Sequence, residues 1–193
     1  MPDYEVICDY IKMQGIWKAS KINICGLMRG YATMIKVLFI CHGNICRSPM
    51  AEFILKDMVK KRGIADQFYI ASAATSTEEI YNGIGNPVYP PAKAELAKHG
   101  ISCEGKRAVQ LKASDYDDYD YLIGMDTMNM RNMERMTHHK QGGKMRMLLT
   151  YAGEDRSVVD PWYSNRFDET YRDVVTGCEA FLSYLKEQGE IDR

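Results

Sequence analysis

A cysteine and an arginine stand close together in one short segment of this sequence. The segment from Cys41 to Ser48 reads Cys-His-Gly-Asn-Ile-Cys-Arg-Ser, with five residues between Cys41 and Arg47. A loop placed between a buried strand and a helix N-terminus points backbone N–H groups into one concavity, and the helix adds its positive end. Such a cradle binds a tetrahedral dianion, and it favours the thiolate of a cysteine at its start. The spacing therefore predicts a phosphate site built around the Cys41 sulfur.

The residue types in this loop suit nucleophilic displacement at phosphorus. The Cys41 thiolate attacks in line and takes the phosphoryl group as a thiophosphate, while the planar fork of Arg47 binds two phosphoryl oxygens. Ser48 can donate a hydrogen bond to the sulfur and ease its later departure. Gly43 lets the backbone approach the oxyanion and can take an unusual φ, and the Asn44 amide can brace the loop from a left-handed conformation. The other loop residues expected to bind phosphate are His42, Ile45 and Cys46.

The same reaction needs a proton donor for the leaving oxygen and a base for the water that follows, and one carboxyl group can serve both steps. The chain has 26 Asp and Glu residues, so composition cannot choose among them. The best local candidate is Asp160, because Pro161 stiffens its loop and two aromatic residues, Trp162 and Tyr163, follow. An Asp-Pro pair is by itself more often an ordinary turn, so the residues alone leave both interpretations open.

Strand and helix patterns alternate from residue 35 onward. The apolar, β-rich run 35–40 predicts a buried parallel strand. After the phosphate loop, Ser48 is the candidate N-cap of a helix with Pro49 at its first position. Further strands are expected at 68–73, 119–125 and 145–149, and further helices at 91–99, from about 126, and at 166–186. This alternation predicts a doubly wound α/β sheet with the phosphate loop after its first strand.

Composition and charge exclude several classes of function. The 193 residues are 46% hydrophobic and 26% charged, which is typical of one globular domain. A net charge of −1 creates no broad attraction for nucleic acid or an anionic membrane, and no apolar run approaches the roughly 18 residues of a membrane span. The start of the sequence lacks the features of a secretory signal. We therefore expect a cytoplasmic protein with no nucleic-acid or membrane partner, in which a monomer is favoured.

Residues 1–34 stand apart from this pattern, because they precede the first predicted strand and show no sustained periodicity. We expect them to be an N-terminal extension, poorly ordered or the product of a wrongly assigned start codon, ahead of a single domain at 35–193. The cysteines are scattered and expected as free thiols in a reducing compartment; they are Cys8, Cys25, Cys41, Cys46, Cys103 and Cys178.

Several segments together resemble the low-molecular-weight protein tyrosine phosphatases. The main one is Val37 to Glu52, which contains the loop described above. The others follow in the family's order: Ser72 to Ser76, Lys98 to Ile101, Tyr119 to Ile123, Met125-Asp126, and Asp160 to Tyr163. The resemblance covers the chain from about Ile35 to its end. It implies a four-stranded parallel sheet flanked by helices, and hydrolysis of phosphate monoesters with neither cofactor nor metal.

The resemblance also assigns roles outside the loop. It makes Asp160 the general acid, and it makes Trp162 and Tyr163 one wall of a cleft deep enough to favour phosphotyrosine or another aryl phosphate over phosphoserine. The opposite wall would come from Thr77 to Pro87, where Tyr81 is the candidate aromatic.

Three other functions remain open on the same residues. An arsenate reductase would pass oxidation from Cys41 to a closely spaced cysteine pair, but the cysteine after Cys103 is Cys178. An arginine phosphatase of this family would typically have a small polar residue in place of Ile45. A phosphate-binding module without catalysis would have no use for a general acid at Asp160.

Some neighbouring residues receive secondary predictions. Cys46 could form a reversible disulfide with Cys41 under peroxide, or it could merely fill the loop. Asp126 and Asn129 either brace the loop or cap the next helix, and the cap is favoured. His99 is assigned no chemistry, and the His138-His139 pair lacks the spacing of a metal site.

Overall fold

The computed structural model describes residues 34–138 and 143–191, and the part from Met34 onward forms one compact unit. Residues 1–33 lie outside the described residues, as do Cys8, Cys25 and His139. The extension expected at 1–34 and the domain boundary after it therefore stay predictions.

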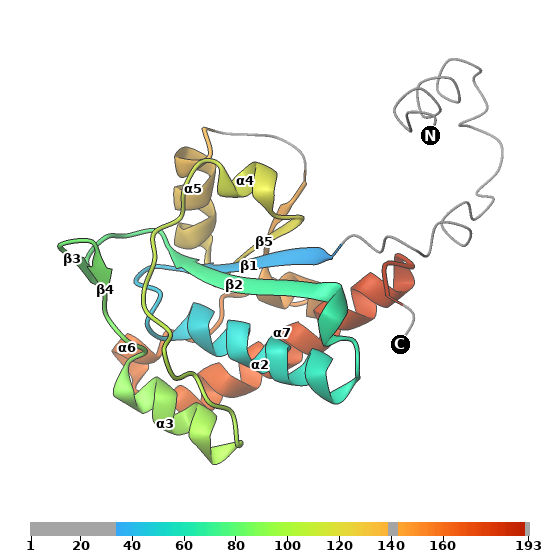
Figure 1. Cartoon of the computed structure of the whole chain (residues 1–193), viewed down its shortest axis with the longest axis horizontal. Coiled ribbons are helices and arrows are strands. Elements are labelled where there is room, and N and C mark those ends of the chain that lie inside the picture. Colours follow the sequence, from blue (N-terminus) through green and yellow to red (C-terminus); the bar gives the residue numbers. More distant parts are fainter. Residues whose placement is uncertain (1–33, 139–142, 192–193) are drawn as a thin grey trace, which may run out of the picture. The chain divides into compact units, whose positions relative to one another are not determined.

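The centre of the fold is a four-stranded sheet in which every neighbouring pair of strands is parallel (Figure 1). In spatial order its strands are β2 (Phe68–Ala74), β1 (Ile35–Cys41), β5 (Tyr121–Gly124) and β6 (Met145–Met147). From β1 the chain moves to one side to form β2, and later to the other side to form β5. Ligands of open α/β sheets bind where the order reverses in this way, outside the carboxyl ends of the strands. The predicted fold class is confirmed, and Cys41 is the last residue of β1.

Helices cover both faces of the sheet (Figure 1). The helices on one face are α2 (Arg47–Lys61), α3 (Pro90–Lys98) and α7 (Phe167–Glu187); those on the other face are α4 (Asp115–Asp118) and α5 (Thr127–Met136). Successive residues of a strand point to opposite faces, so Val37 and Phe39 join the larger core with α2 and α7, while Leu38 and Ile40 join a smaller core with Leu122. No helix in the described part of the chain is long and apolar enough to cross a membrane.

Two of the predicted strands are shorter than expected. The last strand ends at Met147, and Leu148–Ala152 form a 3₁₀ helix. Leu148 and Leu149 are both fully buried in the same core, which a strand cannot achieve for neighbouring residues because its side chains alternate. The strand expected at 119–125 starts at Tyr121, because Tyr119 ends the short helix α4.

A small hairpin was not predicted. Its strands are β3 (Ile80–Tyr81) and β4 (Ile84–Gly85), joined by Asn82-Gly83, and both turn residues have positive φ (50° and 78°). Asn-Gly between short apolar segments is a strong hairpin signal, so this hairpin could have been predicted from the sequence. The hairpin lies at the same end of the sheet as the loop after β1 (Figure 1).

Candidate active site

The loop between β1 and α2 sits at the carboxyl end of the central strand. Helix α2 begins at Arg47, and Cys46 precedes it without a side-chain cap. The prediction that Ser48 is the N-cap is therefore wrong: Ser48 is the second helical residue, and Pro49 the third. The Ser48 hydroxyl is instead turned into the loop, where it contacts Cys41 and Asn44.

The Cys41 sulfur, in a residue only 2% exposed, is contacted by two hydrogen-bonding groups. The Asn44 backbone N–H donates to it at 3.3 Å, and the Ser48 Oγ lies 3.0 Å away. The Ser48 oxygen accepts a hydrogen bond from Asn44 Nδ2 at 2.9 Å, and its single proton can go to the sulfur at 3.0 Å or to the more distant Ala73 carbonyl at 3.5 Å. Two donors directed at one sulfur stabilise a thiolate there.

Asn44 braces the loop through every polar atom of its side chain. Nδ2 donates to Ser48 Oγ at 2.9 Å and to Ser72 Oγ at 2.8 Å, and Oδ1 accepts from the Val109 N–H at 3.1 Å. The backbone of Asn44 is left-handed with φ 57°, which confirms the conformation predicted for it. The unusual φ proposed for Gly43 is not present. A Cβ on Gly43 would instead lie 3.0 Å from Glu79 Cγ, so glycine there allows the 76–79 segment to approach.

A buried carboxylate extends this network, and the sequence analysis missed it. Glu52, on α2 and 4% exposed, accepts a hydrogen bond from Ser72 Oγ at 2.6 Å. Lys106 Nζ lies 2.8 Å from the same carboxylate, and Lys56 Nζ lies 2.5 Å from it. Burial alone would raise the pKa of Glu52, but the two lysines and Ser72 outweigh burial and hold it below its ordinary value of 4.5. Glu52 is thus an ionised support two hydrogen bonds away from Asn44.

The lowered pKa of Glu52 predicts a pH-dependent contribution to stability. The carboxylate stabilises the fold fully above pH 4.5, and this contribution is lost as the pH falls through the lower pKa of the folded state. We expect Glu52→Gln to reduce the free energy of unfolding by about 3 kcal/mol at pH 7, because it leaves the Lys106 ammonium without its carboxylate and with the Ser72 carbonyl as its remaining partner. Urea unfolding at neutral pH and at acidic pH measures this. The difference between wild type and variant should shrink in acid; a constant difference would contradict the ionised pair.

Arg47 connects the loop to two acidic residues from distant parts of the chain. Its Nη1 donates to Asp126 Oδ2 at 2.6 Å, and its Nη2 lies 2.6 Å from Asp160 Oδ2. Burial lowers the pKa of Arg47, but the charges of Cys41, Asp160 and Asp126 more than compensate, so the pKa is raised overall. Asp126 also caps α5 by accepting from the Asn129 N–H at 2.6 Å. The predicted cap is confirmed, and the same carboxylate orients Arg47.

Asp160 is placed by a short helix, α6 (Pro161–Ser164), which lies at the same end of the sheet as the loop (Figure 1). Its Oδ1 accepts the Trp162 N–H at 3.0 Å, which leaves Oδ2 for Arg47. The Trp162 ring lies 5.4 Å from the ring of Tyr89, and Tyr89 donates its N–H to the Ile45 carbonyl at 2.9 Å. Trp162 is 58% exposed and Tyr163 is 89% exposed. Aromatic surface thus stands beside the carboxylate.

Comparison with known proteins decides which family this arrangement belongs to. Residues 36–191 match the family model for low molecular weight phosphotyrosine protein phosphatases. The chain belongs to this family.

Relatives within the family span nearly the whole described chain. The low molecular weight protein-tyrosine-phosphatase YfkJ of Bacillus subtilis is 36% identical over 160 residues, which is 82% of this chain and 100% of that protein. Its crystal structure has a TM-score of 0.75 and covers 81% of this chain and 97% of its own. The crystal structure of a Drosophila arginine phosphatase is 32% identical with a TM-score of 0.70, covering 79% of this chain and 98% of that chain.

The segment after β2 forms the other side of the site in this family member. Thr75 and Ser76 donate their N–H groups to the carbonyls of Cys41 and His42, at 2.9 Å and 3.0 Å. The His42 Nε2 lies 3.0 Å from Glu78 Oε2. Tyr81 lies further along, on β3, and is 79% exposed. The contacts described here on this side of the loop come from residues 75–79, while a role for Tyr81 stays a prediction.

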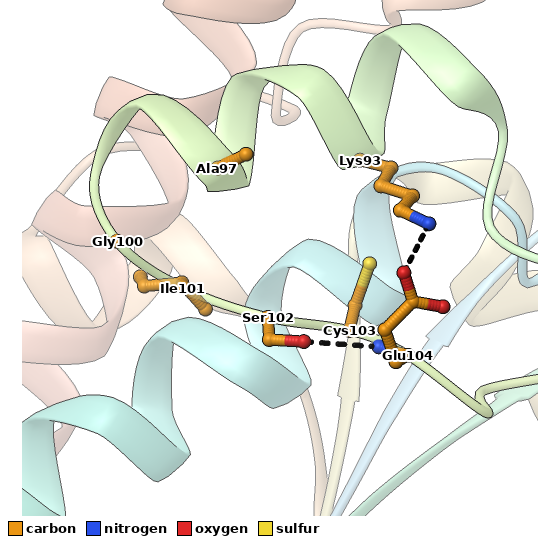
Figure 2. Close-up of a pocket in the computed structure, with 7 residues that line it drawn as sticks. All are labelled: Lys93, Ala97, Gly100, Ile101, Ser102, Cys103 and Glu104. Atoms are coloured by element: carbon orange, nitrogen blue, oxygen red, sulfur yellow. Dashed lines mark hydrogen bonds and ion pairs between the residues drawn. The ribbon is translucent and has the colours of Figure 1, made fainter.

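Cys46, Cys103 and Cys178 are free and buried, as is Cys41. Burial, followed by the nearby Cys41, raises the pKa of Cys46 to about 12, so Cys46 is a thiol at neutral pH and a poor attacking group. Cys103 lies in a hollow of about 260 Å³ between α3 and the segment 100–104, beside the Lys93–Glu104 ion pair (Figure 2). Burial also raises the pKa of Cys103. The disulfide between Cys41 and Cys46 stays a prediction.

In the part of the chain that the structure describes, no group of three or more His, Cys, Asp or Glu side chains has an arrangement that could hold a metal ion. His99 instead stacks on Tyr171, with ring centroids 3.7 Å apart.

Proposed function

We propose that this family member hydrolyses phosphotyrosine, and related aryl phosphate monoesters, through a phosphocysteine intermediate on Cys41. The observation that carries the proposal is the convergence on one loop of three groups with complementary chemistry. A buried sulfur receives two hydrogen-bond donors, and the neighbouring guanidinium of Arg47 contacts the carboxylate of Asp160. A nucleophile, an anion clamp and a proton donor are what phosphoryl transfer to sulfur requires.

In the first step, the Cys41 thiolate attacks phosphorus as the bond to the tyrosyl oxygen breaks. The phosphoryl oxygens accept hydrogen bonds from the loop N–H groups and from Arg47, whose Nη1 is held by Asp126. A dianion bound to Arg47 takes over the Nη2 that Asp160 contacts. The Asp160 carboxylate, released from Arg47, takes up a proton from solvent and gives it to the leaving phenolate oxygen.

In the second step, water attacks the phosphocysteine. Asp160, now a carboxylate, accepts the proton of that water, and the electron pair of the P–S bond returns to sulfur. The departing thiolate is stabilised by the Ser48 hydroxyl and the Asn44 N–H, which lie 3.0 Å and 3.3 Å from the sulfur. Inorganic phosphate leaves, and the starting state is restored. His42, Gly43, Ile45 and Cys46 contribute as the remaining members of the phosphate loop.

An aromatic substrate is favoured over phosphoarginine by the surroundings of the loop. The Ile45 side chain is apolar and 8% exposed, where a phosphoarginine pocket would need a small polar group. Trp162 and Tyr163 supply aromatic surface beside Asp160, against which a phenyl ring can pack. We propose a cytoplasmic, monomeric enzyme with phosphotyrosine proteins as partners.

Steady-state turnover of matched peptides tests this proposal. Peptides of one sequence that carry phosphotyrosine, phosphoserine or phosphoarginine are compared by kcat/KM with EDTA present and thiols reduced. We expect phosphotyrosine to be the best substrate by at least about tenfold, since 1.4 kcal/mol of better transition-state binding is enough for that ratio. A preference for phosphoarginine would replace the proposal with the arginine phosphatase. Absence of turnover with every peptide would favour a binding module.

The role of Asp160 predicts a characteristic dependence on the leaving group. Asp160→Asn should lower kcat/KM for phenyl phosphate by about 100-fold or more, because a poor leaving group depends on proton donation. Dinitrophenyl phosphate, whose phenolate leaves without a proton, should lose much less. Asp155→Asn, an exposed change in the same segment, is the control and should match wild type. An equal loss for both substrates would remove Asp160 from the role of acid.

A further inference from the structure

The segment that leads into Asp160 is attached to the rest of the fold through consecutive backbone groups. The Val158 N–H donates to the Met125 carbonyl at 2.9 Å, next to Asp126. The Val159 N–H donates to Asp173 Oδ2 at 3.0 Å, and the Val159 carbonyl accepts from Thr170 Oγ1 at 2.9 Å. Both polar groups of the residue before Asp160 are therefore held by side chains of α7.

Asp173 is itself held in one orientation by an arginine. Arg156 Nη1 donates to Asp173 Oδ2 at 2.9 Å, and Nη2 donates to Oδ1 at 2.7 Å. The fork is oriented in turn by Glu154, whose Oε2 accepts from Arg156 Nε at 2.6 Å. Such a two-point contact fixes the plane of the carboxylate as well as its position. Asp173 thus contacts both Arg156, three residues before Val159 in the chain, and the Val159 N–H.

Asp173 is a charged residue on the buried face of α7, where charged side chains are rare unless they are paired. Asp173 is 9% exposed and directly precedes Val174, which is fully buried. Burial raises the pKa of Asp173, but Arg156 and the Val159 N–H outweigh it and lower the pKa overall, so the group is ionised at neutral pH. An apolar side chain would often stabilise such a position as well as an ion pair does. What it could not supply is a fixed acceptor for one particular backbone N–H.

We propose that Asp173, locked by Arg156, is a positioning residue that fixes the backbone before Asp160 and so holds its carboxyl in reach of the leaving oxygen. The inference rests on the proposed function, because it requires Asp160 to be the general acid. General acids act only within hydrogen-bond reach, and a misplacement of about 1 Å can cost about 100-fold in rate. Thr170 holds the peptide between Val159 and Asp160 through the Val159 carbonyl, and Asp173 holds the preceding peptide through the Val159 N–H.

The test compares leaving-group dependence in two backgrounds. Asp173→Ala is made in wild type and in Asp160→Asn, and kcat/KM is measured with phenyl phosphate and dinitrophenyl phosphate. In wild type we expect about a tenfold loss with phenyl phosphate and less than about twofold with dinitrophenyl phosphate. In the Asp160→Asn background the same change should cause no further selective loss, because residues that act through one group are not additive.

Matched variants separate positioning from stability. Asp168→Asn removes an exposed carboxylate that pairs with Arg172 on the same helix, and it should leave both rates unchanged. Asp173→Asn can still accept the Val159 N–H through its amide oxygen but loses the charge pair, so it should restore part of the phenyl phosphate rate. If Asp173→Ala does not fold, Arg156→Gln replaces it and should show a loss of about threefold with phenyl phosphate alone.

The outcomes distinguish failure of this inference from failure of the proposed function. Equal losses with both substrates, or a loss that persists in the Asp160→Asn background, would show that Asp173 only stabilises the fold, while the phosphatase mechanism would stand. If Asp160→Asn itself affects both substrates equally, the assignment of the acid fails and the positioning role fails with it.

Discussion

Cys41→Ser should abolish turnover while the protein remains folded and still binds phosphate-like anions. The serine hydroxyl is a far weaker nucleophile than a thiolate at neutral pH, and losing the attacking group of a covalent mechanism costs about 10⁴-fold or more. Anion binding should survive because the contacts that orient the loop through Asn44 and Arg47 do not require the sulfur. The measurement is kcat with para-nitrophenyl phosphate, together with the Kd for vanadate or phosphate by calorimetry.

Cys103→Ser is the matched control for this change, since Cys103 is a buried free cysteine in the hollow beside α3 and has no role in the mechanism. The control should retain wild-type kcat. If Cys41→Ser keeps substantial activity, or if Cys103→Ser loses as much as Cys41→Ser, the nucleophile has been assigned wrongly.

Arg47→Lys should lower kcat/KM by about 1,000-fold, comparable to removing an arginine that stabilises a transferring phosphoryl group. Lysine keeps the positive charge but presents a point charge in place of a planar fork. In the structure, two nitrogens of Arg47 serve two different carboxylates at 2.6 Å each, Asp126 and Asp160. One ammonium group cannot hold Asp126 and also bind two phosphoryl oxygens.

The control for Arg47→Lys is Arg62→Lys at the C-terminal end of α2, which should retain wild-type kinetics. Thermal unfolding of each variant shows whether the fold is intact. A loss of less than about tenfold in a folded Arg47→Lys protein would mean that charge alone is enough, and the bidentate clamp would be abandoned.

The features that could be predicted from the sequence are those set by local patterns. The apolar run 35–40, the loop from Cys41 to Ser48 and the Asp160-Pro161 pair each lie within a few residues, so their spacing alone indicates a strand, an anion cradle and a stiff turn. Even there, the predicted start of α2 was wrong, because Ser48 turns its hydroxyl toward the sulfur instead of capping the helix. The spacing of residues in the sequence does not show whether the Ser48 hydroxyl will contact the Cys41 sulfur or cap the helix.

The supports of the site could not be predicted, because they join residues far apart in the chain. Glu52 meets Lys106 across 54 positions, and Arg47 meets Asp126 across 79. Nothing in composition distinguishes Glu52 or Asp173 among 26 acidic residues; only the folded chain brings each of them to its partner. The Asn82-Gly83 turn is different, since its hairpin signal is local and was overlooked.

Trapping the phosphocysteine tests the central claim most directly. Wild-type enzyme is mixed with para-nitrophenyl phosphate in the presence of EDTA, quenched in acid within milliseconds, and digested for mass spectrometry. We predict a burst of para-nitrophenol and one phosphoryl group on the peptide that contains Cys41. Asp160→Asn should carry the same modification, and Cys41→Ser should carry none. Turnover without any phosphorylated Cys41, or phosphate on another residue, would contradict the mechanism.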